Sequence, residues 1–315
     1  MTLPSADLVP ERGERGRVTS DLPDLLASTV GAWDALLAAV EGVDLGTVGR
    51  KDGRTAARTL VVLGSWTEGR PLARIRDDAL AGVLDAEPLD AIEERVVSMH
   101  AGDDARTILD ALRRARDDIA TWASSPDVVD EARLPVGGPL GVVPFGTLVA
   151  ATAFQCAVAA RDLGPAGVTA PDSLTTAGLA ALIDTVGAVA AQQRAAVSLA
   201  AITPQIRVGT GSLDADWCTR DVADATPSPA LIGDAGLLLD IAAGRVSAPA
   251  AYARGDMRAR DLTGLLALVQ VLAAAPGLPG TEGLRQALQA YTATADAARK
   301  VGDALGGAWK RWTKS

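Results

Sequence analysis

Residues 134–160 contain no charged side chain, and this run limits what the chain can fold into more than any other feature of the sequence. Its first part, PVGGPLGVVP, is rich in Pro and Gly and predicts a loop. The stretch VPFGTLVAATAFQCAVAARDLGP then predicts a helix over Pro144–Leu163. Only roughly 17 residues remain for that helix, which is the lower limit for crossing a membrane, and they include Gln155 and Cys156. We therefore expect a helix buried within a helical bundle and no transmembrane segment.

Composition and charge narrow the class of protein. The 315 residues are enough for two domains, and a hydrophobic content of 48% supports large packed cores. A net charge of −9 repels nucleic-acid phosphates, so we expect no nucleic-acid partner. Cys156 and Cys218 make no disulfide framework and fit a reducing compartment. The N-terminus lacks the apolar segment of a signal peptide, and we expect a cytoplasmic protein.

The first half of the chain has the apolar spacing of helices. Residues 1–20 are charged and contain Pro and Gly, which predicts a loose arm. Residues 21–166 are expected to form a four-helix bundle. Its helices are predicted at Leu22–Val43, Arg54–Trp66, Asp103–Ala123 and Pro144–Leu163. In the third helix the charged segment RRARDD is interpreted as a solvated face.

The second half has a different texture. Gly164–Asp172 is rich in Gly and Pro and predicts a domain boundary, followed by a helix over Ser173–Ala200. The segment IRVGTGSLDADW alternates weakly, while SPALIGDAGLLLDIAAGRV and YARGDMRARDLTGLLALVQVLAAA are each typical of a strand, a turn and a helix. A small α+β domain is therefore predicted over residues 172–280, with a C-terminal helix over residues 281–315. The expected fold class is α plus α+β.

Few residues suggest chemistry directly. The only histidine, His100, cannot make a His-rich metal site and is interpreted as a surface or capping group. Cys156 is interpreted as an inert buried thiol. One local group of charges is interpreted as ion pairs around a turn, with contact to an anionic ligand group as the alternative. This group comprises Arg245, Arg254, Asp256 and Arg258.

Four motifs, in this order of elements, resemble a known family. They are TLVVLGSW (Thr59–Trp66), VPFGTLVAATAFQCAVAARDLGP, ALIGDAGLLLDIAAGRV and ARGDMRARDL. The first part resembles the DinB-like N-terminal domain of mycothiol-dependent maleylpyruvate isomerases. The second part resembles the sterol-carrier-type domain that is often fused to it. The resemblance covers most of residues 20–275.

The resemblance implies where a metal site would lie. In that family a divalent metal is held by a His at the end of helix two and by a Glu and a His four residues apart on helix four. The matching positions here are Val62, Gln155 and Ala159, none of which is a competent ligand, while Asp162 matches a retained acid. The metal site is therefore predicted to be lost, with no cofactor. The predicted ancestral pocket comprises Val62, Trp66, Gln155, Cys156 and Ala159.

Three functions stay open. The first is binding of a small apolar molecule or lipid in the second domain, unless the same side chains simply fill its core. These side chains are Leu237, Leu238, Leu239, Ile241, Leu265, Leu266 and Val269. The second is an enzyme that uses the ancestral pocket, either an isomerase, a thiol or group transferase, or a metal-independent catalyst. The third is a protein-interaction scaffold. The basic tail WKRWTKS is interpreted as solvated, with an acidic partner or a membrane surface as the alternative.

Overall fold

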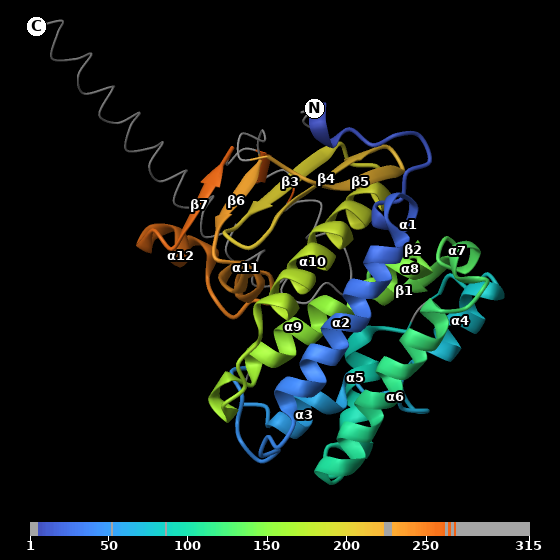
Figure 1. The fold of residues 1–315 in the computed structure, drawn as a ribbon, viewed down its shortest axis with the longest axis vertical. Helices are drawn as coiled ribbons and strands as arrows, with labels where there is room; N and C mark the ends of the chain where they lie inside the picture. Colours follow the sequence, from blue (N-terminus) through green and yellow to red (C-terminus); the bar gives the residue numbers. More distant parts are fainter. Residues whose placement is uncertain are drawn as a thin grey trace, which may run out of the picture.

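The chain folds into a group of helices on which a five-stranded sheet is stacked, with one long helix between them (Figure 1). The computed structural model describes residues 6–51, 53–85, 87–223 and 229–261, together with Gly264, Leu265 and Leu268. The expected mixture of helices and a sheet is confirmed. The predicted C-terminal helix over residues 281–315 lies outside the described residues.

The first part of the chain is mainly helical, with one short hairpin whose strands β1 and β2 are antiparallel. Its elements are η1 Ala6–Leu8, α1 Arg17–Ser20, α2 Leu22–Val40, α3 Ala56–Val61, α4 Leu72–Leu80, α5 Leu89–His100, α6 Ala105–Ala123, α7 Val128–Glu131, β1 Pro135–Gly138, β2 Gly141–Pro144, α8 Phe145–Ala150, α9 Thr152–Asp162 and η2 Gly164–Ala166.

The second part contains the sheet, whose strand order is β5-β4-β3-β6-β7. Strands β3 and β6 are parallel, and the other neighbours are antiparallel. The elements are α10 Asp172–Gln192, β3 Val197–Ile202, β4 Arg207–Leu213, β5 Asp216–Asp221, β6 Ala230–Gly233, α11 Ala235–Ala242, α12 Ala248–Arg254 and β7 Met257–Arg260. The parallel pairing requires a crossover after β5, which brings the chain back beside β3.

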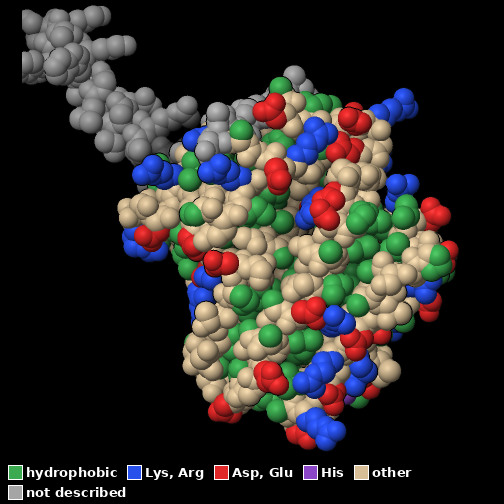
Figure 2. Space-filling model, in the orientation of Figure 1, with side chains coloured by type: hydrophobic (Ala, Val, Ile, Leu, Met, Phe, Trp, Pro, Cys, Tyr) green, Lys and Arg blue, Asp and Glu red, His purple; other side chains and the backbone are tan. Residues whose placement is uncertain are grey.

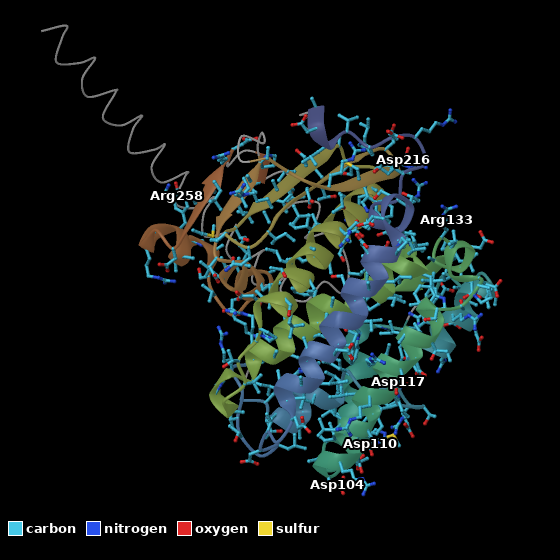
Figure 3. The ribbon with its side chains drawn as sticks, in the orientation of Figure 1. Asp104, Asp110, Asp117, Arg133, Asp216 and Arg258 are labelled. Carbon is cyan, nitrogen blue, oxygen red and sulfur yellow. The ribbon has the colours of Figure 1, made fainter. Side chains whose placement is uncertain are left out.

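Helix α6 shows how local sequence sets an element. The side chain of Asp104 accepts a hydrogen bond from the backbone amide of Thr107 at 2.7 Å and caps the first turn. The predicted apolar face is buried at Ile108, Leu112, Ile119 and Trp122. The acidic residues labelled on this helix in Figure 3, Asp104, Asp110 and Asp117, lie away from the rest of the fold. The helix and its solvated face are thus confirmed.

Helix α10 is the centre of the core. It contacts α2 and α9 on one side and β4 and β5 on the other. Its small residues allow this close approach, because a Cβ atom at Gly178 would collide with Ala157, and one at Gly187 would collide with Thr210. It is also long and apolar enough to cross a membrane, but 83% of its most apolar window is buried inside the fold. One hydrophobic cluster therefore runs through both parts of the chain.

The expected loose arm is instead packed over residues 6–20. Leu8 is 1% exposed and lies over β4, where Gly209 and Gly211 leave room for it. Further along, the amide of Gly16 donates to the carbonyl oxygen of Trp217 at 2.8 Å, which attaches the arm to the edge of β5. Burial of Leu8 and pairing with an edge strand hold the arm, neither of which its charged composition indicated.

Several other predicted element boundaries differ from those in the structure. The predicted loop over residues 134–143 forms the hairpin β1–β2. The predicted helix four is divided at Ala151 into α8 and α9, and helix two is only Ala56–Val61. Helix α10 ends at Gln192, and the rest of the predicted Ser173–Ala200 helix contributes to β3, whose backbone pairs with β4 and β6. Pairing with distant strands overrode the local apolar pattern there.

The last predicted strand also lies later than expected. The segment beginning at Tyr252 belongs to α12, and the strand begins only at Met257. Gly255 between them has a φ of 79°, a left-handed conformation that suits the end of a helix. Residues 230–242 form the expected strand and helix, β6 and α11, whereas β3 and α12 were not predicted.

Candidate functional site

The positions that the resemblance predicted as former metal ligands lie on α9 and at the end of α3, two helices that are in contact. Val62 follows the last residue of α3 and is half-buried. On α9, Ala159 is 4% exposed, whereas Gln155 and Val158 are half-buried. Gln155, Val158 and Arg161 follow at helical spacing, so α9 keeps one partly open face. We call these three residues the α9 stripe.

The two predicted positions on α9 supply no metal ligand. Gln155 presents an amide and Ala159 a methyl group, neither of which replaces the carboxylate and imidazole that hold a divalent ion. Across the described ranges, no three His, Cys, Asp or Glu side chains are grouped so that they could share a metal ion.

Two residues of the predicted pocket face elsewhere. Cys156 is completely buried, and this burial raises the pKa of its thiol far above the ordinary value, so the thiol is inert. Trp66 lies in the loop after α3 and donates its indole hydrogen to the carbonyl oxygen of Val61 at 2.6 Å. Its ring stacks on His100 at the end of α5. The structure therefore does not bring these two side chains to the α9 stripe.

The predicted apolar cavity residues are part of the packed interior where they are described. Leu238 and Leu239 belong to the hydrophobic cluster that runs through both parts of the chain. Ile241 belongs to a smaller cluster with Ala251 and Met257. Leu237 and Leu265 are partly buried against these clusters. Leu266 and Val269 lie outside the described residues. The core-filling interpretation accounts for the packing of those that are described.

Acidic and basic side chains are interspersed over the face drawn in Figure 2. A denser group lies where α9 meets the loop before α3 and the helix α11. Asp240 of α11 receives two hydrogen bonds from Arg161, at 2.9 and 2.7 Å, and two from Arg50, at 3.2 and 3.0 Å. Burial alone would raise the pKa of Asp240, but the two guanidinium groups outweigh it and hold the pKa below its ordinary value.

A second buried pair stands beside the first. Arg245 binds Asp162 through two hydrogen bonds of 2.7 Å each, and the side chain of Asp162 is only 3% exposed. The backbone carbonyl oxygen of Asp162 also accepts the amide of Arg50 at 2.8 Å. The acid that matches the family therefore joins the end of α9 to the segment after α11. The neighbouring charges predicted with Arg245 are separate from it, because Arg254 pairs with Asp256 on the surface.

Lys51 lies near these ion pairs. Burial lowers the pKa of its ammonium group, Glu93 opposes that effect, and the nearby Arg54 and Arg245 lower the pKa further. No acceptor among the described side chains or carbonyl groups lies within hydrogen-bonding distance of this ammonium. We call Arg50, Lys51, Arg161 and Arg245, with Asp162 and Asp240, the junction cluster. Further acids stand around these cations, because Glu93 lies near the ammonium of Lys51 and Asp234 lies near Arg161.

The junction cluster could not be found by local motif. Arg50 and Asp240 are 190 residues apart, and Arg161 and Asp240 are 79 residues apart. Two of its members had been singled out in the sequence: Asp162 through the family resemblance, and Arg245 within a local group of charges.

Comparison with known proteins gives fold-level likeness only. No protein-family model matches the chain, and no curated protein matches it significantly. Among solved structures, the mycothiol-dependent maleylpyruvate isomerase matches with a TM-score of 0.47 and 16% identity over 72% of this chain and 90% of that chain. A point mutant of that enzyme matches with the same TM-score and coverage and 14% identity. Likeness at this level does not establish family membership.

Proposed function

We propose that this chain is a metal-independent binding protein for a small organic molecule with an apolar body and one anionic group. The observation that carries the proposal is Lys51, a half-buried ammonium that makes no hydrogen bond to a described residue and lies near the guanidinium groups of Arg54 and Arg245. Its lowered pKa reflects the energetic cost of that environment, which an anionic group would offset. The apolar part of the ligand would lie along the α9 stripe, where Gln155 offers an amide for orientation.

We further propose that the chain is a divergent relative of maleylpyruvate isomerase that has lost the metal. The four motifs named above support this relationship. In this proposal, the DinB-like bundle lies within residues 21–166 and consists of the helices α2, α3, α6 and α9. The order α10, three antiparallel strands, a crossover to the parallel β6, then α11 and β7 supports a sterol-carrier-like domain over residues 172–280. A cytoplasmic location stays a prediction, as does any acidic or membrane partner of the tail.

The first experiment is native mass spectrometry of gently purified protein, with elemental analysis of the same sample. We expect less than stoichiometric metal and an additional organic mass of one molecule per chain. Metal at one equivalent would overturn the metal-independent assignment and favour an enzyme of the isomerase or thiol-transferase class.

The second experiment tests Lys51 with two fluorescent probes of similar shape. One is 1-anilinonaphthalene-8-sulfonate, an apolar body with one anionic group, and the other is the neutral N-phenyl-1-naphthylamine. We expect Lys51→Met to weaken the sulfonate about tenfold, since a charge-assisted hydrogen bond contributes roughly 1.5–3 kcal/mol. The neutral probe should bind the variant and the native protein equally.

The matched control is Arg58→Met, which removes one positive charge from the exposed side of α3. It should leave both affinities unchanged. Equal weakening by Lys51→Met and Arg58→Met would mean that general charge, and not the junction cluster, attracts the sulfonate. Equal loss of both probes in Lys51→Met alone would indicate a damaged site and would contradict the assigned role of the ammonium.

A further inference from the structure

His100, the only histidine of the chain, joins three separate segments at the end of α5. Its Nδ1 lies 3.0 Å from Oδ2 of Asp103, in the turn before α6. Its Nε2 lies 3.1 Å from Oε2 of Glu68, in the loop between α3 and α4. The imidazole is 16% exposed and the two carboxylates about twice as much. The ring is therefore a bridge between the α3–α4 loop and the α5–α6 turn.

The geometry requires two ring protons. An ionised carboxylate only accepts hydrogen bonds, and a neutral imidazole has a single N–H to donate. Both contacts of His100 can be hydrogen bonds at once only when the ring is the imidazolium ion. Loss of one proton would leave a ring nitrogen lone pair facing a carboxylate oxygen, which is repulsive.

The same ring also supports Trp66. The two rings are stacked, with centroids 3.8 Å apart and planes inclined by 16°. A cationic imidazole gains from lying over an indole face, and the guanidinium of Arg114 lies 6.0 Å from the centre of the same indole. Deprotonation would remove one of these two cations. Trp66 is only 6% exposed, so this stack closes the loop over the interior.

Two further hydrogen bonds hold the α3–α4 loop in addition to the contacts of His100. The amide of Gly69 donates to the carbonyl oxygen of Trp66 at 3.1 Å, and Nε of Arg95 donates to the carbonyl oxygen of Glu68 at 2.7 Å. These contacts do not depend on a proton with a pKa near neutrality. Only the contacts of His100 do, since no other histidine exists in the chain.

We propose that His100 is a proton-operated clamp: as imidazolium it holds the α3–α4 loop against the α5–α6 turn, and loss of its ring proton releases the loop and uncovers Trp66. The clamp is a property of the fold and does not depend on the proposed ligand.

The direction of the pH response follows from the neighbours of the ring. Burial alone would lower the pKa of His100, but the hydrogen bonds to Asp103 and Glu68 outweigh it and raise the pKa above the ordinary 6.5. The charged groups around the ring are those two carboxylates, Arg114 across Trp66, and Arg95 on the backbone of Glu68. A raised folded pKa means that the stabilisation is complete below about 6.5 and is lost as pH rises through the higher folded value.

The test is a pH titration of the imidazole signals by NMR, which a single histidine makes unambiguous. We expect a midpoint above 6.5 in the native chain, a lower midpoint in both Glu68→Gln and Asp103→Asn, and no change in the control Glu94→Gln. Glu94 is an exposed residue of the same helix that does not contact the ring. A midpoint at or below 6.5, or equal midpoints in all four proteins, would overturn the proposal.

A second readout separates a clamp from a merely structural contact. The fluorescence of Trp66 is isolated as the difference between the native chain and Trp66→Phe, and its quenching by acrylamide is followed across the same pH range. We expect quenching to increase with the NMR midpoint and to be high at all pH values in His100→Gln. If the imidazole titrates with a raised midpoint but the quenching of Trp66 stays constant, the ring is not a clamp.

Discussion

Replacing Arg245 with Met tests the link between the end of α9 and the segment after α11. The guanidinium makes two hydrogen bonds of 2.7 Å to Asp162, and the side chains are 16% and 3% exposed, respectively. Met keeps much of the apolar stem and removes the charge. The variant would leave a carboxylate out of water without its partner, which is far more costly than the loss of the pair as a whole.

The expected magnitude comes from that burial. Removing one partner of a buried pair costs about 3–5 kcal/mol. Lys51 offsets a part of this, because it is close enough for Asp162 to raise its pKa. We therefore expect a loss near the lower end, about 3 kcal/mol, which corresponds to roughly 5 °C in the midpoint of thermal unfolding for a chain of this size.

The assay is urea unfolding followed by circular dichroism, with Arg254→Met as the matched control. Arg254 forms an ion pair with Asp256 in which both side chains are about half exposed, so its loss should cost less than about 1 kcal/mol. The double variant Asp162→Asn with Arg245→Met should recover part of the stability, because the orphaned charge is gone. If Arg245→Met unfolds no earlier than Arg254→Met, Asp162 is effectively solvated and the reasoning fails.

Three further predictions concern other buried groups. Burial raises the pKa of Asp184 above the ordinary 3.8, so its ionisation destabilises the fold as pH rises through the folded value. The urea midpoint of Asp184→Asn should therefore increase relative to that of the native chain between pH 4 and 7. Parallel pH profiles of the two proteins would contradict this. The thiol of Cys156 should react with a maleimide only in denaturant, and rapid reaction in the native state, detected by mass, would show that the helix opens. Gly211→Ala places a methyl group against the backbone carbonyl of Leu8 and should release the N-terminal arm. Trypsin should then cleave the arm faster than in the native chain. An unchanged cleavage rate would mean that the arm is not held there.

Local patterns were sufficient for the long helices. The spacing of apolar residues and the capping Asp104 located α6 within about two residues at each end, because these signals act over one or two helical turns. The same signals located α2 and the beginning of α10. They failed at residues 197–200, where an apolar, Ala-rich segment is a strand.

The candidate site depends on contacts between residues that are far apart in the sequence. The family resemblance pointed to Gln155 and Ala159, and their four-residue spacing implies one helix face. It also grouped Trp66 and Cys156 with them. Structure separates both, because the orientation of a side chain around a helix or in a loop is set by what packs against it. A pocket that contains Val62, Gln155 and Ala159 stays a prediction.

Composition and spacing thus account for the class of fold, the helical segments and the absence of local metal-ligand residues at Val62, Gln155 and Ala159, since each is a property of residues close in the chain. The ion-pair partners of the charged groups are set by the tertiary structure. Asp240 meets Arg50 across 190 residues, and Arg245 meets Asp162 across 83. Which cation neutralises which carboxylate, and why Lys51 has no described acceptor, follows from how α9, α11 and the loop before α3 pack, because electrostatic energy depends on distance in space and on burial, not on position in the sequence.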